Sequence, residues 1–230
     1  MKTLIITRDF ATNFWIYGWL ARTTELANFL ASKGHDVHVL TISRFQTKPI
    51  SFINEKIKIT ELRCGSHYWQ TQGPTVFSRA MRLIFRIWES LLKDNMQIDS
   101  LEPYISRIER HAHELIRGHG IKNVVISSPP HSLQLLVPRF KEIYQDFINI
   151  VSDFRDPWTG AARYRPHDPK KLKYFEDMQK LAANNSDIRT TVSRELADSL
   201  YELTAKKFEV VRNGFSGDNI KNMASPNAAV

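Results

Sequence analysis

FINIVSDFRDPWTG, residues 147–160, is an apolar run followed by alternating acidic and basic residues and then by a proline. The run is short and rich in Ile, Val and Phe, which is typical of a buried β-strand. Because Pro157 has no N–H to donate, we expect the strand to end before it. The segment therefore predicts a buried strand with Asp153, Arg155 and Asp156 at its carboxyl end.

Similar apolar runs alternate with amphipathic stretches on both sides of this segment. Strands are predicted at 3–7, 37–42, 57–62, 123–127, 147–152, 188–192 and 208–213. Helices are predicted at 19–33, 75–94, 101–118, 132–144, 169–183 and 194–203. Continuous Val and Ile runs separated by helices indicate a parallel sheet covered on both faces. The predicted fold class is α/β, with a doubly wound, mostly parallel, Rossmann-like sheet.

Composition limits the function classes. With 230 residues and 42% hydrophobic residues the chain can bury a sizeable core. Cys64 is the single cysteine, which excludes an intrachain disulfide and a cysteine-based zinc site. No apolar run approaches the roughly 20 residues of a membrane span and the first residues lack a secretion signal, so we expect a cytoplasmic protein. The net charge of +8 indicates an anionic partner, such as phosphate, nucleic acid or an acidic membrane surface.

Loops at the predicted carboxyl edge are the places for binding residues in an open parallel sheet. Gly18 follows the first strand and begins a helix whose N–H groups could hold a phosphate or a sugar hydroxyl. His131 follows the fourth strand, and Ser193 is placed to cap a helix. Arg194 comes next, where it could face the crevice. One glycine in place of GxGxxG and no GxxxxGK[ST] argue against a dinucleotide site and a P-loop.

The same residues have ordinary structural explanations. Asp153 and Arg155 could pair with each other or cap neighbouring helices. A loop histidine such as His131 is more often solvated than catalytic. Arg194 could be a solvated arginine of a first helical turn.

The helix predicted at 75–94 has an unusual distribution of side chains. Four basic residues lie on one side and five apolar residues on the other: Arg79, Arg82, Arg86 and Lys93 against Phe77, Met81, Ile84, Trp88 and Leu91. A basic helix with aromatic residues can lie in an anionic membrane interface. The alternative is an ordinary core helix with a solvated face.

Five segments in order resemble the N-terminal half of glycosyltransferases of the family-4-like group, which are two-domain GT-B enzymes. They are GHDVHVLT (34–41), SSPPHSLQLL (127–136), SDFRDPWTG (152–160), TTVSRELADSL (190–200) and VVRNGF (210–215). The resemblance covers nearly the whole chain, and DFRDPWTG is its most specific part. It implies that 1–215 is a Rossmann-like acceptor-binding domain and that 216–230 leads as a linker toward a C-terminal domain that binds the donor.

The resemblance also implies an activity. It is the transfer of a sugar, with retention, from a nucleotide-sugar to a polysaccharide, glycolipid or other acceptor, without a cofactor or a metal. The substrates are the partners, together with the chain's own C-terminal domain. Asn213 and Gly214 would begin the hinge, and Gly18 would lie near the donor phosphate or the acceptor. Relatives usually have two glycines where this chain has Tyr17 and Gly18.

The chemistry of transfer assigns the remaining roles. Asp156 or His131 would orient the acceptor hydroxyl, and Arg155 or Arg194 would meet a phosphate or an acceptor oxygen, with Asp153 and Ser193 beside them. The alternatives are half of a GT-B sugar-nucleotide epimerase and a basic nucleic-acid-binding module. The first would lack the DFRDPWTG segment. The second would need interleaved basic and aromatic residues on one face, and we expect no nucleic-acid partner. The enzyme would be cytoplasmic, at the inner face of the membrane when the helix at 75–94 binds it.

Overall fold

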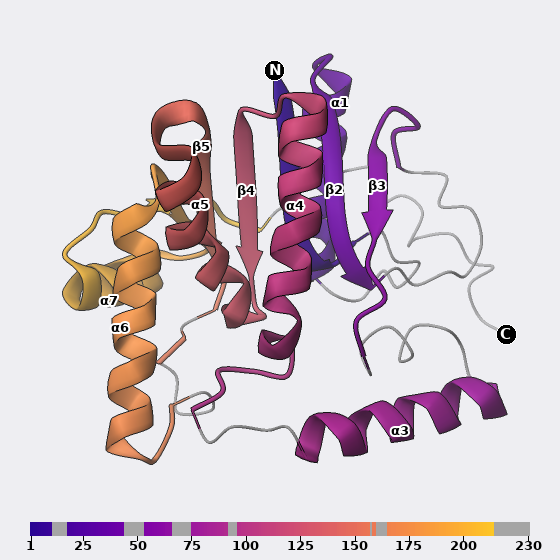
Figure 1. The fold of residues 1–230 in the computed structure, drawn as a ribbon. Coiled ribbons are helices and arrows are strands. Elements are labelled where there is room, and N and C mark those ends of the chain that lie inside the picture. Colours follow the sequence, from indigo (N-terminus) through magenta and orange to yellow (C-terminus); the bar gives the residue numbers. More distant parts are fainter. Residues whose placement is uncertain are drawn as a thin grey trace, which may run out of the picture.

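The computed structural model describes residues 1–10, 18–43, 53–65, 75–91, 96–156, 158–159 and 165–213. In these ranges seven strands form one sheet in the order β3-β2-β1-β4-β5-β6-β7, and every neighbouring pair is parallel (Figure 1). The strands are β1 (Lys2–Asp9), β2 (Asp36–Ser43), β3 (Lys58–Glu61), β4 (Asn123–Ser128), β5 (Asn149–Phe154), β6 (Ile188–Thr191) and β7 (Glu209–Val210). The predicted parallel α/β fold is confirmed.

The described helices and strands follow one another in the order that the sequence predicts. They are α1 (Gly18–Ser32), α3 (Val76–Leu91), α4 (Ile105–His119), α5 (Leu136–Tyr144), α6 (Pro169–Asn185) and α7 (Arg194–Thr204). Short 3-10 turns precede α4 and α5 and follow α5, at Glu102–Tyr104, His131–Leu135 and Gln145–Phe147. None of the described helices has both the length and the apolar character needed to cross a bilayer.

Several predicted boundaries differ from the observed ones, and two of these differences have a local cause. The helix predicted at 132–144 begins only at Leu136, after a 3-10 turn in which the N–H and the hydroxyl of Ser132 donate to Asp99, at 2.9 and 2.6 Å. The strand predicted at 147–152 begins and ends two residues later. Phe147 belongs to the 3-10 turn, whereas Asp153 continues the ladder opposite Ser127.

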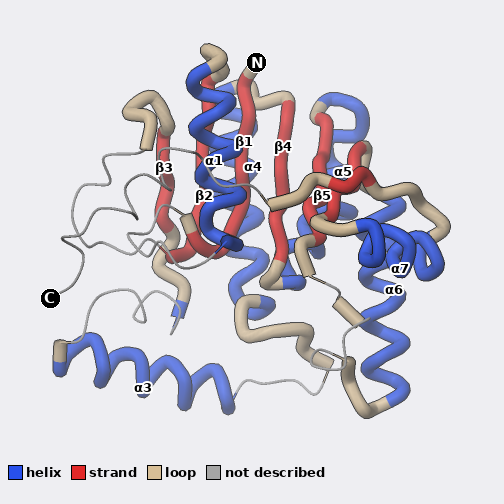
Figure 2. Tube along the Cα trace, turned by 180° about the vertical axis from the view of Figure 1, so that it is seen from behind, coloured by secondary structure: helices blue, strands red, loops and turns tan. Residues whose placement is uncertain are grey.

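The sheet separates two cores. On one face, α4, α5 and α6 cover the sheet, and α7 packs beside α6 (Figures 1 and 2). On the other face, α1 packs over β1 and β2. Side chains of β1 alternate between these cores, with Leu4 and Ile6 in the first and Ile5 in the second. Burial of consecutive residues explains why this strand reads as a continuous apolar run.

The strand order reverses direction between β1 and β4. The chain builds outward from β1 to β2 and β3 on one side, and then from β4 to β7 on the other. Loops that leave the carboxyl ends of β1 and β4 therefore diverge, which creates a crevice where open α/β sheets bind ligands.

One helix departs from this layered plan. Figures 1 and 2 show α3 beyond the carboxyl edge of the sheet, away from both helix layers. Ser78 is its one buried residue among those that the structure describes. The alternative of an ordinary core helix with a solvated face is therefore wrong. Lys93, which the prediction included, lies outside the described residues.

Candidate functional site

The loops after β4 and β5 lie side by side at the carboxyl edge of the sheet. Ser128 pairs with Phe154 at the end of the ladder, and the N–H of Arg155 donates to the carbonyl of Ser128 at 3.1 Å. The peptide bonds from Ser128 to Pro129 and from Pro129 to Pro130 are both cis. This geometry brings His131, from one loop, close to Arg155 and Asp156, from the other.

Arg155 is buried, with 6% of its surface exposed. Its Nε donates to the Ser128 carbonyl at 3.1 Å, and its Nη2 donates to the Pro129 carbonyl at 2.8 Å. Burial lowers the pKa of the guanidinium from its usual value, and the carboxylates of Asp153 and Asp156 oppose that shift. Arg155 lies in the loop after β5, and these two hydrogen bonds hold the loop after β4 in place.

His131 is also buried and stacks on Trp158, with ring centroids 5.4 Å apart and an interplanar angle of 9°. Burial lowers the pKa of His131 to about 4, while Asp99 and Asp156 act to raise it and Arg155 acts to lower it. At neutral pH the imidazole is therefore uncharged, so it can accept a hydrogen bond or a proton.

The pKa of His131 predicts a specific pH dependence of stability. The unfolded chain binds more protons than the folded chain between the two pKa values, about 4 and 6.5. The contribution of His131 is thus complete above about pH 6.5 and is lost as the pH falls toward 4. Replacing His131 by phenylalanine should flatten the fall in unfolding free energy over this interval, as measured by urea titration at several pH values.

The exposed His167 provides a control for this experiment. His167→Gln should leave the pH profile unchanged. His38 keeps part of the slope in every variant, because burial lowers its pKa as well. An unchanged slope in His131→Phe would contradict the assignment of a buried neutral imidazole.

Asp153 points toward the opposite face of the sheet from the first core. Its Oδ2 accepts from Arg22 Nε at 2.9 Å and from the Ser127 hydroxyl at 2.8 Å. Its Oδ1 accepts from Arg22 Nη2 at 2.7 Å and from the Thr190 hydroxyl at 2.7 Å. The carboxylate is 7% exposed, and its four donors come from α1, β4 and β6. Asp153 therefore forms a buried junction, which links β5 to α1, β4 and β6 through hydrogen bonds.

Arg22 extends this junction to the end of the described chain. Its Nη1 donates to the carbonyl of Val211 and, at 3.3 Å, to Oδ1 of Asn213. The guanidinium thus joins the first helix to strand β5 and to the residues that follow β7.

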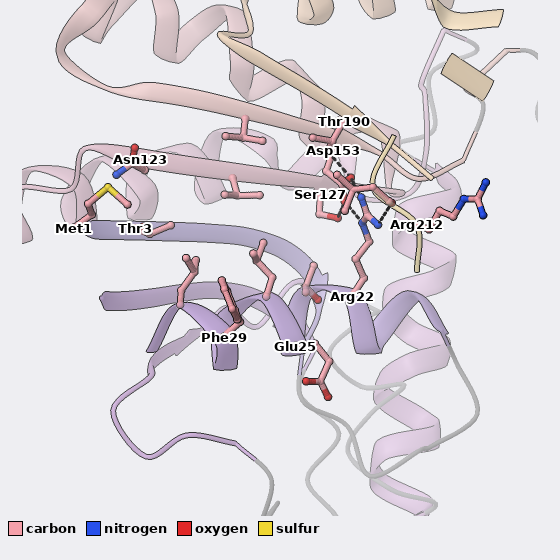
Figure 3. Close-up of a pocket in the computed structure, with 16 residues that line it drawn as sticks. Met1, Thr3, Arg22, Glu25, Phe29, Asn123, Ser127, Asp153, Thr190 and Arg212 are labelled. Carbon is pink, nitrogen blue, oxygen red and sulfur yellow. Dashed lines mark hydrogen bonds and ion pairs between the residues drawn. The ribbon is translucent and has the colours of Figure 1, made fainter. Parts of the chain in front are cut away.

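A groove of about 660 Å³ ends at this junction (Figure 3). It runs along the sheet from Met1 and Asn123 to Asp153 and Arg212. Its walls are mainly apolar and come from α1 and from the strands: Leu26, Phe29, Leu30, Val125 and Val151. Within the part of the chain that the structure describes, the prediction of a sheet covered on both faces is therefore only partly met, because this groove lies on the second face.

The other predicted site residues lie nearby at the same edge or beyond the described part. Ser193 caps α7 as predicted, since its hydroxyl accepts from the N–H of Leu196 at 3.2 Å. Arg194 is exposed. Gly18 is the first residue of α1, where the sequence places a helix start. Gly214, the second hinge residue, lies outside the described residues.

Comparisons with known proteins add a distant likeness of fold. No protein-family model matches the chain, and no curated protein matches it. The chain resembles a solved structure from Rickettsia africae ESF-5. That structure is a glycosyltransferase. The identity is 13% and the TM-score 0.47, over 96% of this chain, which spans 48% of the length of the other. A likeness of this size carries no argument about function, so the function is argued from the site.

Four charged residues of the site were not predicted. Arg8 and Asp9 end β1 and act electrostatically on Arg155 across the reversal point of the sheet. The rule that selected the other loops could have found them, because they directly follow a predicted strand. Asp99 and Arg22 carried no such signal. Asp99 binds Ser132 and Arg22 binds Asp153, and both partners are far away in the sequence.

Proposed function

We propose that the chain is the acceptor-binding half of a family-4-like GT-B glycosyltransferase. The observation that carries the proposal is the cluster of His131, Arg155 and Asp156 beside the reversal point of the sheet. These residues come from two of the segments that resemble the family, and they lie close enough in the fold for Arg155 and Asp156 to influence the pKa of His131. The order of the five segments supports the same assignment.

The chemistry of sugar transfer suits this cluster. Departure of a nucleoside diphosphate leaves positive charge on the sugar ring and negative charge on the phosphate. Arg8 and Arg155 supply positive charge beside the carboxylates of Asp9 and Asp156. Their partly buried setting strengthens each interaction relative to water.

Individual roles follow from exposure. Asp156 is half-buried, so its carboxylate can accept a hydrogen bond from an acceptor hydroxyl. The neutral imidazole of His131, in the loop after β4, lies near that carboxylate and interacts with it electrostatically. The exposed Arg194 is available to a phosphate, whereas Arg155 shapes the loop that carries His131.

The remaining parts of the proposal concern what lies beyond the described fold. The donor is a nucleotide-sugar, it is bound by a C-terminal domain that follows the hinge at Asn213 and Gly214, and no cofactor takes part. The acceptor is a polysaccharide, a glycolipid or a related sugar, and the reaction takes place in the cytoplasm with retention.

Transfer should require more than the 230 residues. The longer product of the gene should release nucleoside diphosphate from a nucleotide-sugar in the presence of acceptor, whereas the 230-residue chain should not, because positioning of donor and acceptor is lost. In the longer product Asp156→Asn should lower turnover by about 100-fold. Chromatographic detection of the released diphosphate measures both effects.

Asp198→Asn, on the exposed side of α7, is the matched control and should keep full turnover. Turnover by the 230-residue chain at the rate of the longer product would refute the two-domain proposal. Equal turnover of Asp156→Asn and the parent would remove the assignment of the site.

A further inference from the structure

The apolar side of α3 is exposed along its whole length. Seven large apolar residues are between 47% exposed (Trp88) and 84% exposed (Val76). They are Val76, Phe77, Leu83, Ile84, Ile87, Trp88 and Leu91. Spacings of three, four and seven residues place them on one broad face of the helix. A contiguous apolar face of this kind on a folded protein marks an interaction surface.

The opposite side of α3 fixes this orientation. Ser78 is buried, and Met81, Phe85 and Glu89 are half-buried, again at spacings of three and four. Oη of Tyr104, in the turn before α4, donates to Oε1 of Glu89 at 3.0 Å. Among the described residues, those of α3 with the lowest exposure form a narrow strip, and the seven large apolar residues lie on the more exposed side of the helix.

Gly65 packs against the hydrogen bond between Tyr104 and Glu89, which supports the same contact of α3 with the turn before α4. A Cβ at this position would collide with Oη of Tyr104 and with Oε1 of Glu89. The backbone of Gly65 also has a φ of +49°, which favours glycine. Because glycine has no side chain, Gly65 leaves room for the hydrogen bond between Tyr104 and Glu89. This bond helps to fix the direction of α3.

Positive charge borders the apolar face. Arg79, Arg82 and Arg86 are all exposed, and the single acidic residue of α3 is Glu89, which is bonded to Tyr104. A helix with an apolar face and a rim of arginines matches the interface of an anionic bilayer, where acyl chains lie next to phosphates. We propose that α3 docks the protein onto the surface of a membrane that contains anionic lipids.

The charge distribution favours a bilayer over a second copy of the chain. Two α3 faces packed together would bring two rims of arginines close to each other, which like-charge repulsion disfavours. An anionic lipid surface instead neutralises the rim while it covers the apolar residues.

Docking through α3 would also orient the sheet. Figure 1 shows α3 beyond the carboxyl edge, so the membrane surface would lie on the side of the site loops. Combined with the proposed function, on which this step alone rests, the placement favours an acceptor that is anchored in lipid.

Flotation with lipid vesicles tests the docking without any assay of transfer. The 230-residue chain should float with vesicles of phosphatidylcholine and phosphatidylglycerol at low salt, and added salt should weaken this binding. The triple variant Arg79→Gln, Arg82→Gln, Arg86→Gln should lose about 100-fold in affinity. Ile87→Glu should abolish the insertion of the apolar face, and circular dichroism confirms that both variants fold.

A second triple variant removes the same charge elsewhere. Arg110→Gln, Arg165→Gln and Lys206→Gln change exposed residues outside α3 and should leave vesicle binding unchanged. Four results would overturn the proposal: no binding at low salt, equal binding to pure phosphatidylcholine, equal loss in the two triple variants, or a dimer in sedimentation that Ile87→Glu dissociates. The last result would assign α3 to a second copy of the chain.

Discussion

Replacing Asp153 by alanine should lower the free energy of unfolding by about 3–5 kcal/mol, because it leaves the guanidinium of Arg22 buried without its carboxylate. The hydroxyls of Ser127 and Thr190 lose their acceptor at the same time. For a chain of this size each kcal/mol corresponds to about 2–4 °C in Tm, so a large shift is expected. Urea unfolding followed by circular dichroism measures the change.

Two further variants make this experiment specific. Asp198→Ala removes an exposed carboxylate and should change stability by no more than about 0.5 kcal/mol. Arg22→Met combined with Asp153→Ala should cost less than the sum of the two single changes, since neither charge then remains buried alone. If the effects of the two single changes on the free energy of unfolding were strictly additive, Arg22 and Asp153 would have no measurable interaction energy.

Arg155→Ala should also lower stability, by about 2–4 kcal/mol, because the carbonyl of Pro129 loses its side-chain donor and the carbonyl of Ser128 keeps only the backbone N–H of residue 155. This expectation differs from the sequence interpretation, in which Arg155 meets a phosphate or an acceptor oxygen. Chemical denaturation of the variant measures the loss, and Arg155→Lys should restore little of it, because one ammonium cannot reproduce the planar fork.

Arg194→Ala is the matched control at the same edge of the sheet. Its side chain is exposed, so its removal should change the unfolding free energy by no more than about 0.5 kcal/mol. If Arg155→Ala were as stable as this control, the hydrogen bonds of Arg155 to the loop after β4 would contribute nothing measurable to the free energy of unfolding. A purely catalytic role of Arg155 would then be favoured.

Local patterns in the sequence were enough to predict the fold. The order of strands and helices follows from apolar runs and their periods, and Ser193 could be recognised as a cap because the acceptor and donor are three residues apart. The carboxyl-edge position of Asp153, Arg155 and Asp156 follows from the end of a buried strand. Each of these features depends on residues that are near one another in the chain.

Features that depend on distant residues could not be predicted. Asp153 and Arg22 are separated by 131 positions, so nothing in either segment indicates their pairing. The low pKa of His131 depends on burial against Trp158, which the loop sequence does not reveal. The amphipathic pattern of α3 was visible, but the side that faces outward is decided by Tyr104 and Glu89.

The junction at Arg22 constrains the order in which the chain can be completed during synthesis. Arg22 lies near the start of the chain, whereas its acceptor on Val211 is separated from it by 189 positions. A nascent chain on the ribosome can form β1, α1 and β2 early, but it cannot close this junction until the residues after β7 have emerged. The last bond that anchors α1 at its Arg22 end is therefore completed late in translation, and protease resistance of that helix in stalled chains should reach its full level only once Val211 has left the exit tunnel.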